Sequence, residues 1–237
     1  MSRLISFGDS FTWGTDLSDS TPGMPRPSQL TWSALFARHR GLKYTCLARP
    51  GASNHEIARI FFNYSNDITD QDLVVINWSW IDRWEYFNSN LPKHLYGPTH
   101  NEFFWLEDQH QWVQVRPDDT KEKYYWANYH SELNDKWKSL QLIYSAKSWL
   151  DKRKIPYLMT CVDSLIIDQE FHTPNYILTL QNEVLDSLFW FDNQGFVDWS
   201  RTKGYPVSAG WHPLELAHSQ AAELIFTSFD TQNTNGR

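Results

Sequence analysis

The chain has 237 residues, of which 41% are hydrophobic, enough to form a substantial buried core. Its formal net charge of −7 argues against non-specific binding to nucleic acid, because the phosphate backbone attracts basic proteins. No stretch approaches the roughly 20 apolar residues of a membrane-spanning helix, and no apolar segment near the start is long enough for a signal peptide. We therefore expect a cytoplasmic or otherwise soluble protein, with no membrane insertion and no nucleic-acid partner.

Aromatic residues are unusually frequent, at 16% of the chain, and 13 of them are tryptophan. Tryptophan supplies both packing area and flat surfaces for stacking. Core packing explains most of these rings, and a sugar-stacking surface is the alternative interpretation. The two cysteines, Cys46 and Cys161, each lie in an apolar, strand-like stretch, which favours free buried thiols over a disulfide.

In chain order, the first part of the sequence alternates between strand and helix patterns. Apolar residues at helical spacing predict one helix that starts at Trp32 and stops before Gly41, and a second helix that Asn54 caps. Short apolar runs predict buried strands over Leu4–Phe7, Tyr44–Ala48 and Leu73–Ile76.

From about residue 84 to residue 129 the sequence is polar and aromatic, without sustained periodicity. A structureless loop of that length is uncommon in a compact domain. We therefore predict an insertion with short structure of its own, lying over one end of the sheet. It is suited to a lid, a sugar-stacking wall or an oligomer contact. Its large rings include Trp84, Tyr86, Phe87, Trp105, Trp112 and Trp126.

The second half of the sequence returns to the alternating pattern. It predicts a long helix through Leu133 and Tyr144, followed by a strand over Tyr157–Val162. Further along, it predicts a helix over Tyr176–Phe191, a short strand over Phe196–Asp198 and a last helix over Leu214–Ile225. Alternation of this kind predicts a three-layer α/β/α sandwich with a mostly parallel, flavodoxin-like sheet of about five strands. We expect a single domain over residues 1–237. In such sheets, ligands bind beyond the carboxyl ends of the strands.

Three short motifs fall at that edge of the predicted sheet. The first strand ends in Gly8, Asp9 and Ser10, the second is followed by Gly51, and His212 precedes the last helix. In this order and at these positions, the motifs resemble the conserved blocks of the SGNH (GDSL-type) serine hydrolases. The resemblance spans residues 4–226, and the middle of the chain contributes little to it.

The resemblance implies that Ser10 is a nucleophile, that His212 is its general base, and that the N–H groups of Ser10 and Gly51 bind an oxyanion. These residue types suit the chemistry. A serine hydroxyl is a poor nucleophile until a base takes its proton, and imidazole titrates near neutrality. Glycine has no side chain, so a substrate can approach the N–H group of Gly51 closely.

The first departure from the family pattern concerns the acid that orients the histidine. The family usually places an Asp three residues before it, and this chain has Ala209 there. Two replacements remain open: Asp198, which lies upstream, or a backbone carbonyl that holds the ring of His212. The loss of an orienting acid can cost several orders of magnitude in rate.

The second departure concerns the third block, which in the family reads Gly-x-Asn-Asp after the third strand. Here the chain runs from Asn77 to Arg83 as Asn-Trp-Ser-Trp-Ile-Asp-Arg. The third oxyanion donor is therefore Asn77, the Ser79 hydroxyl, the Trp80 indole N–H, or absent. Losing one such donor typically costs roughly 10²–10³ in rate.

Further residues near the motifs are candidates for substrate contact, although a structural role is the alternative interpretation for several of them. Asp9 would support its turn, Asn54 would cap a helix, and Arg83 would form a surface ion pair with Glu85. His218 is interpreted as structural, and no pair of histidines has the spacing of a helical zinc site, so neither a metal nor a cofactor is expected. The candidate contacts are Asp9, Asn54, Trp80, Arg83 and Trp211.

The sequence thus predicts a serine ester hydrolase that forms an acyl-enzyme on Ser10 and acts on a small-molecule or glycan ester. Analogy with the family favours acetylated carbohydrates. The alternative is a catalytically weak protein on the same fold that binds a glycan or a partner protein, which Ala209 and the altered third block would explain. The oligomeric state is left open.

Overall fold

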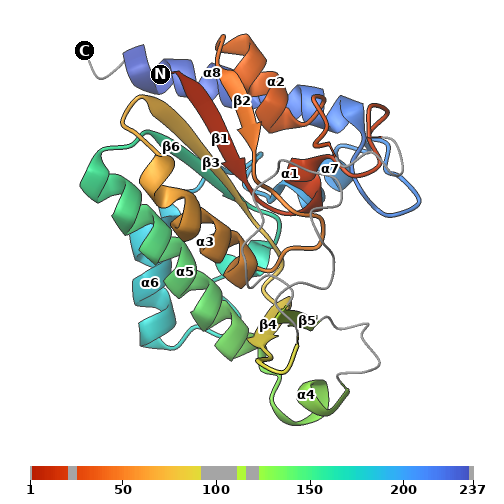
Figure 1. The fold of residues 1–237 in the computed structure, drawn as a ribbon, viewed down its shortest axis with the longest axis vertical. Coiled ribbons are helices and arrows are strands. Elements are labelled where there is room, and N and C mark those ends of the chain that lie inside the picture. Colours follow the sequence, from red (N-terminus) through yellow and green to blue (C-terminus); the bar gives the residue numbers. More distant parts are fainter. Residues whose placement is uncertain (1, 21–25, 92–110, 116–122, 235–237) are drawn as a thin grey trace.

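The computed structural model describes residues 2–20, 26–91, 111–115 and 123–234 (Figure 1). Within these residues, one sheet has four strands, all parallel, in the order β2-β1-β3-β6. The strands are β1 (Arg3–Phe7), β2 (Lys43–Cys46), β3 (Asp72–Trp78) and β6 (Tyr157–Cys161). The predicted α/β class with a parallel sheet is confirmed.

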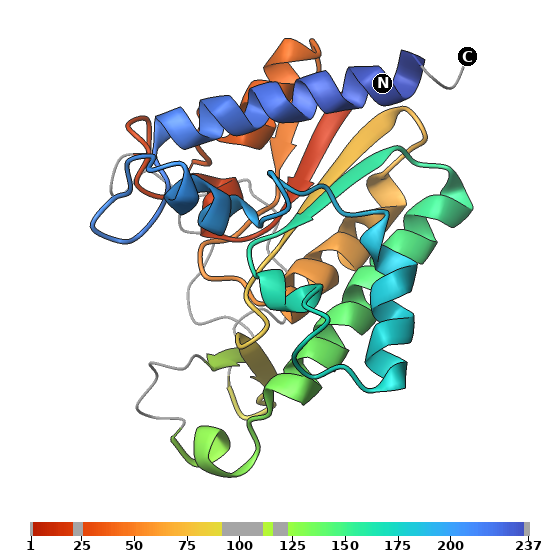
Figure 2. The ribbon, with the colours of Figure 1, turned by 180° about the vertical axis from the view of Figure 1, so that it is seen from behind.

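Helices cover both faces of the sheet, as Figures 1 and 2 show from opposite sides. One face packs against α3 (Asn54–Tyr64), α5 (Glu132–Arg153) and α6 (Asn175–Leu185). The other packs against α2 (Trp32–His39), α7 (Phe196–Thr202) and α8 (Glu215–Thr234). Shorter helices are α1 (Ser10–Trp13), η1 (Ser65–Asp67) and η4 (Ser164–Ile166). None of the helices in the described part of the chain is both long and apolar enough to cross a membrane.

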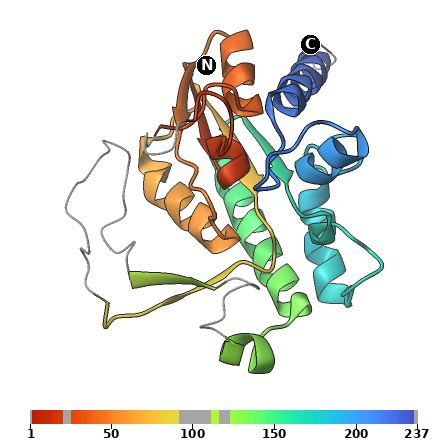
Figure 3. The ribbon, with the colours of Figure 1, turned by 90° about the vertical axis from the view of Figure 1, so that its right-hand side faces the viewer.

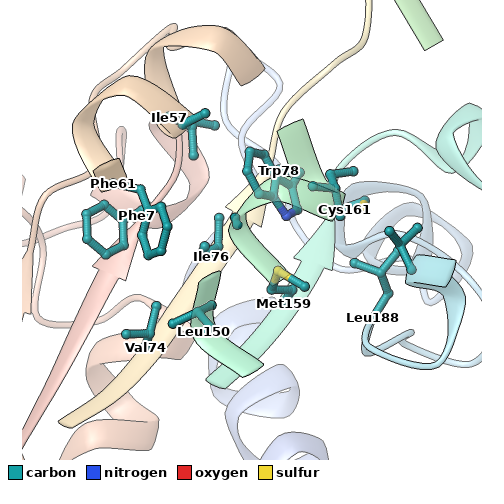
Figure 4. Packing of buried hydrophobic residues seen from close by; sticks show 14 of the residues in the cluster. Phe7, Ile57, Phe61, Val74, Ile76, Trp78, Leu150, Met159, Cys161 and Leu188 are labelled. Carbon is teal, nitrogen blue, oxygen red and sulfur yellow. The ribbon is translucent and has the colours of Figure 1, made fainter. Parts of the chain in front are cut away.

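The central strand β3 is buried along its whole length, which explains its unbroken apolar run. Because side chains alternate along a strand, β3 contributes to two separate cores. Val74, Ile76 and Trp78 belong to the core beneath α3 and α5 (Figure 4). Leu73 and Val75 belong to the core beneath α2 and α8. The two cores therefore meet at the same strand.

The stretch predicted as an insertion contains a small antiparallel pair, β4 (Trp84–Phe87) with β5 (Trp112–Val115), and the helix α4 (Lys123–Asn128). Figure 3 shows this pair at the opposite end of the molecule from α8. Trp84 stacks on Tyr125 of α4, with ring centroids 4.4 Å apart. Trp105 lies outside the described residues, and so does the rest of 92–110.

Two sequence predictions are wrong in the second half of the chain. Residues 196–198 are not a strand but the first turn of α7, whose buried residues Phe196, Val197, Trp199 and Ser200 follow helical spacing. Three apolar residues are too few for periodicity to separate a strand from a helix. The helix predicted to reach Phe191 ends at Leu185.

Beside the edge strand β6, where a fifth strand of the sheet would lie, the described residues form a single parallel bridge between Met159 and Leu188. The described sheet therefore has four strands rather than about five. Cys46 and Cys161 are buried and free, as predicted.

Candidate active site

Ser10 is presented by α1, a single helical turn that follows β1 at the carboxyl edge of the sheet. The carboxylate of Asp9 caps this turn by accepting a hydrogen bond from the Phe11 N–H at 3.1 Å. Gly8 lets the turn fold closely over the strand end, because a Cβ atom there would lie 2.3 Å from Thr12 Oγ1. The sequence Gly-Asp-Ser thus fixes where the serine hydroxyl points.

The structure brings Ser10 and His212 together across 202 positions of the chain. Ser10 Oγ lies 3.0 Å from His212 Nε2, within hydrogen-bond distance. On the other side of the ring, His212 Nδ1 lies 2.8 Å from Asp16 Oδ2. A hydroxyl, an imidazole and a carboxylate in this order are the groups that can activate a serine as a nucleophile.

Ser208 holds the acid and the histidine loop in place. Its hydroxyl donates to Asp16 Oδ2 at 2.7 Å and accepts from the backbone N–H groups of Gly210 and His212. The hydrogen bond from Ser208 lowers the pKa of Asp16 below its ordinary value, and His212 lowers it further. Asp16 is therefore ionised at neutral pH and suited to stabilise a protonated imidazole.

Asp16 and Ser208 belong to this arrangement, and neither was predicted from the sequence. Both expected replacements for the missing Asp are wrong: Asp198 lies on α7 with its carboxylate 3.9 Å from Arg201, and a carboxylate rather than a carbonyl faces the ring. Asp16 lies only six residues after Ser10, on the opposite end of the chain from His212. No spacing rule of the family points to that position.

The N–H groups of Ser10 and Gly51 have the properties of oxyanion donors. Neither donates a hydrogen bond to another described residue. Gly51 adopts a φ of 81°, a left-handed conformation that glycine accepts without strain. Both N–H groups are thus free to bind an oxyanion within the described residues, and that role stays a prediction.

Ser79 of the third block is hydrogen-bonded to Asn54 and to Asp9, the residue before Ser10. Asn54 accepts from the Ser79 N–H at 2.7 Å and donates to the Ser79 carbonyl and to Ser139. Ser53, not Asn54, caps α3. The Ser79 hydroxyl donates to Asp9 at 2.8 Å. The predicted substrate contact of Asn54 is therefore wrong, since its side chain is buried and already bonded.

Asn77 is also wrong as a third oxyanion donor. It belongs to β3, opposite Thr160 of β6, and its side chain is fully buried in the sheet. Its amide atoms make no hydrogen bond to any described residue. Ser79 is unsuitable too, because its hydroxyl proton is directed at Asp9.

Arg83 pairs with Asp9 rather than with Glu85. Its Nη1 lies 3.1 Å from Asp9 Oδ2, while Glu85 pairs with Arg59. Complete burial raises the pKa of Asp9, and the charge of Arg83 and the Ser79 hydrogen bond oppose that effect. Asp9 is therefore a supporting residue, and its predicted contact with substrate is wrong.

Two tryptophans are chain neighbours of residues in this site: Trp80 follows Ser79, and Trp211 precedes His212. Trp80 is partly buried against the core beneath α2 and α8. Trp211, next to His212, has 68% of its surface exposed and a φ of 65°, a conformation that is strained for a bulky residue. The guanidinium carbon of Arg201 lies 5.9 Å from its ring centroid. Both rings remain candidates for substrate contact.

His218 is structural, as predicted. It is fully buried, its Nδ1 accepts the Trp32 N–H, and burial lowers its pKa to about 3, so the ring is neutral. Over the described ranges, no group of three or more His, Cys, Asp or Glu side chains is arranged to hold a metal ion.

Solved structures with the same arrangement of elements are G-D-S-L lipolytic proteins and esterases. One from Veillonella parvula, a member of the lipolytic G-D-S-L family, is 12% identical, with a TM-score of 0.51 over 97% of this chain and 99% of that chain. The chain has the fold of the SGNH hydrolases. No protein-family model matches its sequence, and no curated protein does.

Two further structures with the SGNH fold are esterases. The acetyl xylan esterase Est2A from Butyrivibrio proteoclasticus is 11% identical, with a TM-score of 0.51 over 98% of this chain and 64% of that chain. The psychrotrophic esterase EstA from Pseudoalteromonas is 9% identical, with a TM-score of 0.50 over 99% and 100%. The similarity is therefore one of fold, at very low sequence identity.

Proposed function

We propose that this protein is a serine ester hydrolase of the SGNH type, which forms an acyl-enzyme on Ser10. The observation that carries the proposal is the continuous chain of contacts from Ser10 Oγ to His212 to Asp16, at 3.0 and 2.8 Å. If Ser10 only capped a helix, its hydroxyl would not require a hydrogen bond to His212. If His212 only preceded a helix, its ring would not require a hydrogen bond to Asp16.

In the proposed reaction, Ser10 Oγ attacks the carbonyl carbon of an ester while His212 Nε2 takes the hydroxyl proton. The electron pair of the carbonyl moves to its oxygen, which the N–H groups of Ser10 and Gly51 bind. His212 then returns the proton to the leaving alcohol as the carbon–oxygen bond breaks. Water, activated by the same imidazole, hydrolyses the acyl-enzyme.

Acetylated carbohydrates are the substrate class that we favour. The exposed indole of Trp211 beside His212 offers a flat surface for a sugar ring, and Est2A, one of the structural neighbours, is an acetyl xylan esterase. A protein that only binds glycans or a partner on this fold is the alternative. The bonded Ser10–His212–Asp16 arrangement favours the enzyme, since binding alone does not require it.

The test is hydrolysis of p-nitrophenyl acetate by the wild type and by the Ser10→Ala and His212→Ala variants. We expect wild-type turnover and a fall of at least about 10²-fold in kcat/KM for each variant. The xylan link is tested separately by acetate release from acetylated xylan. Equal rates for wild type and both variants, together with no labelling of Ser10 by a fluorophosphonate, would replace the enzyme with the binding protein.

A further inference from the structure

A buried negative charge lies beside the proposed nucleophile. Asp9 directly precedes Ser10 in the chain, and its side chain has no exposed surface. Its carboxylate receives three hydrogen bonds, from the Phe11 N–H, the Ser79 hydroxyl and Arg83 Nη1, and a group that faces only donors is held as a carboxylate. An anion in this position opposes the negative charge that develops on a substrate oxygen next to Ser10, unless a cation compensates for it.

Arg83 is the cation that compensates, and it joins the three loops that make up the site. Nη1 contacts Asp9 from the loop after β1, the Ala52 carbonyl from the loop after β2, and Ser79 Oγ from the loop after β3. Ala52 follows Gly51, whose N–H is a proposed oxyanion donor. The guanidinium therefore lies between the two loops that supply the backbone donors.

The guanidinium also has unused donors. All the hydrogen bonds of Arg83 within the described residues come from Nη1, so the N–H groups at Nη2 and Nε are left without a protein acceptor there. The side chain keeps 18% of its surface exposed, so these groups are not sealed in the interior. Three other polar side chains near this position are not available: those of Ser79 and Asn54 are already hydrogen-bonded within the described residues, and Asn77 is buried in the sheet.

We propose that Arg83 is the third oxyanion-stabilising group of this site, in place of the Asn side chain that the family pattern supplies after the third strand. The proposal rests on the proposed function and adds a catalytic residue to it. Arg83 donates hydrogen bonds to the negatively charged oxygen of the tetrahedral intermediate, and it neither gives nor takes a proton. A charged donor is roughly twice as strong as a neutral one, and so replaces an amide without loss.

A purely structural role for Arg83, as counter-ion of Asp9, makes a different prediction for paired variants. Asp9→Asn removes the charge that needs a counter-ion, so Arg83→Met can be compared within that background without leaving an unpaired buried charge. We expect the kcat of Asp9→Asn/Arg83→Met for p-nitrophenyl acetate to be about 10- to 10²-fold lower than the kcat of Asp9→Asn. The KM values of the two variants should differ by less than about threefold. Equal kcat values in the two variants would overturn the proposal.

The chain offers a matched control at the far end of the same strands. Arg3 of β1 pairs with the buried carboxylate of Asp72 of β3 at 2.7 Å. The same comparison, Asp72→Asn with Asp72→Asn/Arg3→Met, removes a similar guanidinium without approaching Ser10. We expect kcat to differ by less than about threefold between these two variants. A loss equal to that of the Asp9 pair would mean that destabilisation, not oxyanion binding, causes both.

A second readout reports on the tetrahedral adduct itself. Phenylboronic acid forms a tetrahedral, anionic adduct with an active serine. Its inhibition constant should therefore rise from Asp9→Asn to Asp9→Asn/Arg83→Met by a factor similar to the loss of kcat between the same two variants. An unchanged inhibition constant would contradict the proposal. If Trp80→Phe in the Asp9→Asn background weakens phenylboronic acid binding and Arg83→Met in that background does not, the indole is the third donor and the proposal is wrong.

The outcomes separate this proposal from the one it rests on. A wild type that neither turns over the ester nor binds phenylboronic acid overturns the proposed function and Arg83 with it. An active wild type in which Asp9→Asn and Asp9→Asn/Arg83→Met behave alike overturns the role of Arg83 alone.

Discussion

Asp16 orients His212 through one carboxylate oxygen, which also accepts the hydroxyl of Ser208. We predict that Asp16→Asn lowers kcat/KM for p-nitrophenyl acetate by about 10²–10⁴, because an amide favours the wrong tautomer of the imidazole. Asp16→Glu should recover part of the loss. Asp198→Asn is the control, and its activity should stay within about threefold of wild type. A larger loss in Asp198→Asn than in Asp16→Asn would reverse the assignment of the acid.

Gly210 is a second residue on which the same contact depends. A Cβ atom at this position would lie 2.8 Å from Asp16 Oδ2 and 3.2 Å from His212 Nδ1. We predict that Gly210→Ala lowers kcat/KM by roughly 10–10², because a displacement of the order of 1 Å in a catalytic group can cost that much. Gly204→Ala is the control for contact with the site: nothing lies within 4 Å of its added Cβ atom, and its φ of 69° places the strain of alanine in the local backbone, away from Asp16 and His212. Equal activities in the two variants would show that the carboxylate moves aside without consequence.

At the scale of single residues, the sequence identified the groups whose motif places them at a strand end. Ser10, Gly51 and His212 each have such a motif, and the structure places Ser10 and His212 in contact. Asp16 belongs to no such motif, because its contact with His212 forms only when the loop after α1 folds against the loop before α8. Contacts of this kind depend on tertiary structure and have no local signal.

At the scale of elements, charged side chains dock the β4–β5 pair onto α3. Glu85 of β4 pairs with Arg59 of α3 at 3.1 Å, and the guanidinium of Arg59 lies 4.6 Å above the ring of Trp112 in β5. Gln114 of β5 donates to Glu56 of α3. This docking was not predicted from the sequence, which suggested an ion pair of Glu85 with Arg83, two residues away, rather than with Arg59, 26 residues away on α3.

Glu85 makes the stability of this docking depend on pH. Burial raises the pKa of Glu85 to about 7, although Arg59 opposes the shift. Because the folded state then holds the proton more tightly than the unfolded chain, the contribution of Glu85 to stability is lost as pH rises from about 4.5 through about 7.

Glu85→Gln removes that titration. We therefore predict that the melting temperature of Glu85→Gln, relative to that of the wild type, is higher at about pH 8 than at about pH 5. The corresponding change in the free energy of unfolding is at most on the order of 3 kcal/mol. Thermal melts of both proteins at the two pH values are the measurement. A difference that is constant with pH, or that moves in favour of the wild type, would contradict the raised pKa of Glu85.

For the molecule as a whole, the strand–helix alternation was sufficient to predict the layers of the fold, but not the number of strands. The mainly apolar runs in β1, β3 and β6 are typical of strands that helices cover on both faces, and their short lengths favour strands over helices. The short stretch at Phe196 was ambiguous, and the bridge at Leu188 is a single pair that leaves no periodic pattern.

The two cores share strands β1 and β3, so we expect them to unfold together. Trp78 lies in the core beneath α3 and α5, and Trp32 and Trp199 lie in the other, so tryptophan fluorescence includes signals from both cores. Urea unfolding followed by tryptophan fluorescence and by far-ultraviolet circular dichroism should therefore give coincident midpoints. Separate midpoints would show that one helix layer unfolds independently of the other.

The central claim is that His212 and Asp16 activate Ser10 as a nucleophile. Labelling with a fluorophosphonate, located by peptide mass spectrometry, tests this most directly, and the structural neighbour EstA has been solved with monoethylphosphonate as inhibitor. We predict stoichiometric labelling at Ser10 in the wild type, none in Ser10→Ala, and labelling slowed by at least about 10²-fold in His212→Ala. An unlabelled wild type, or labelling of Ser10 at the same rate in His212→Ala, would contradict the account.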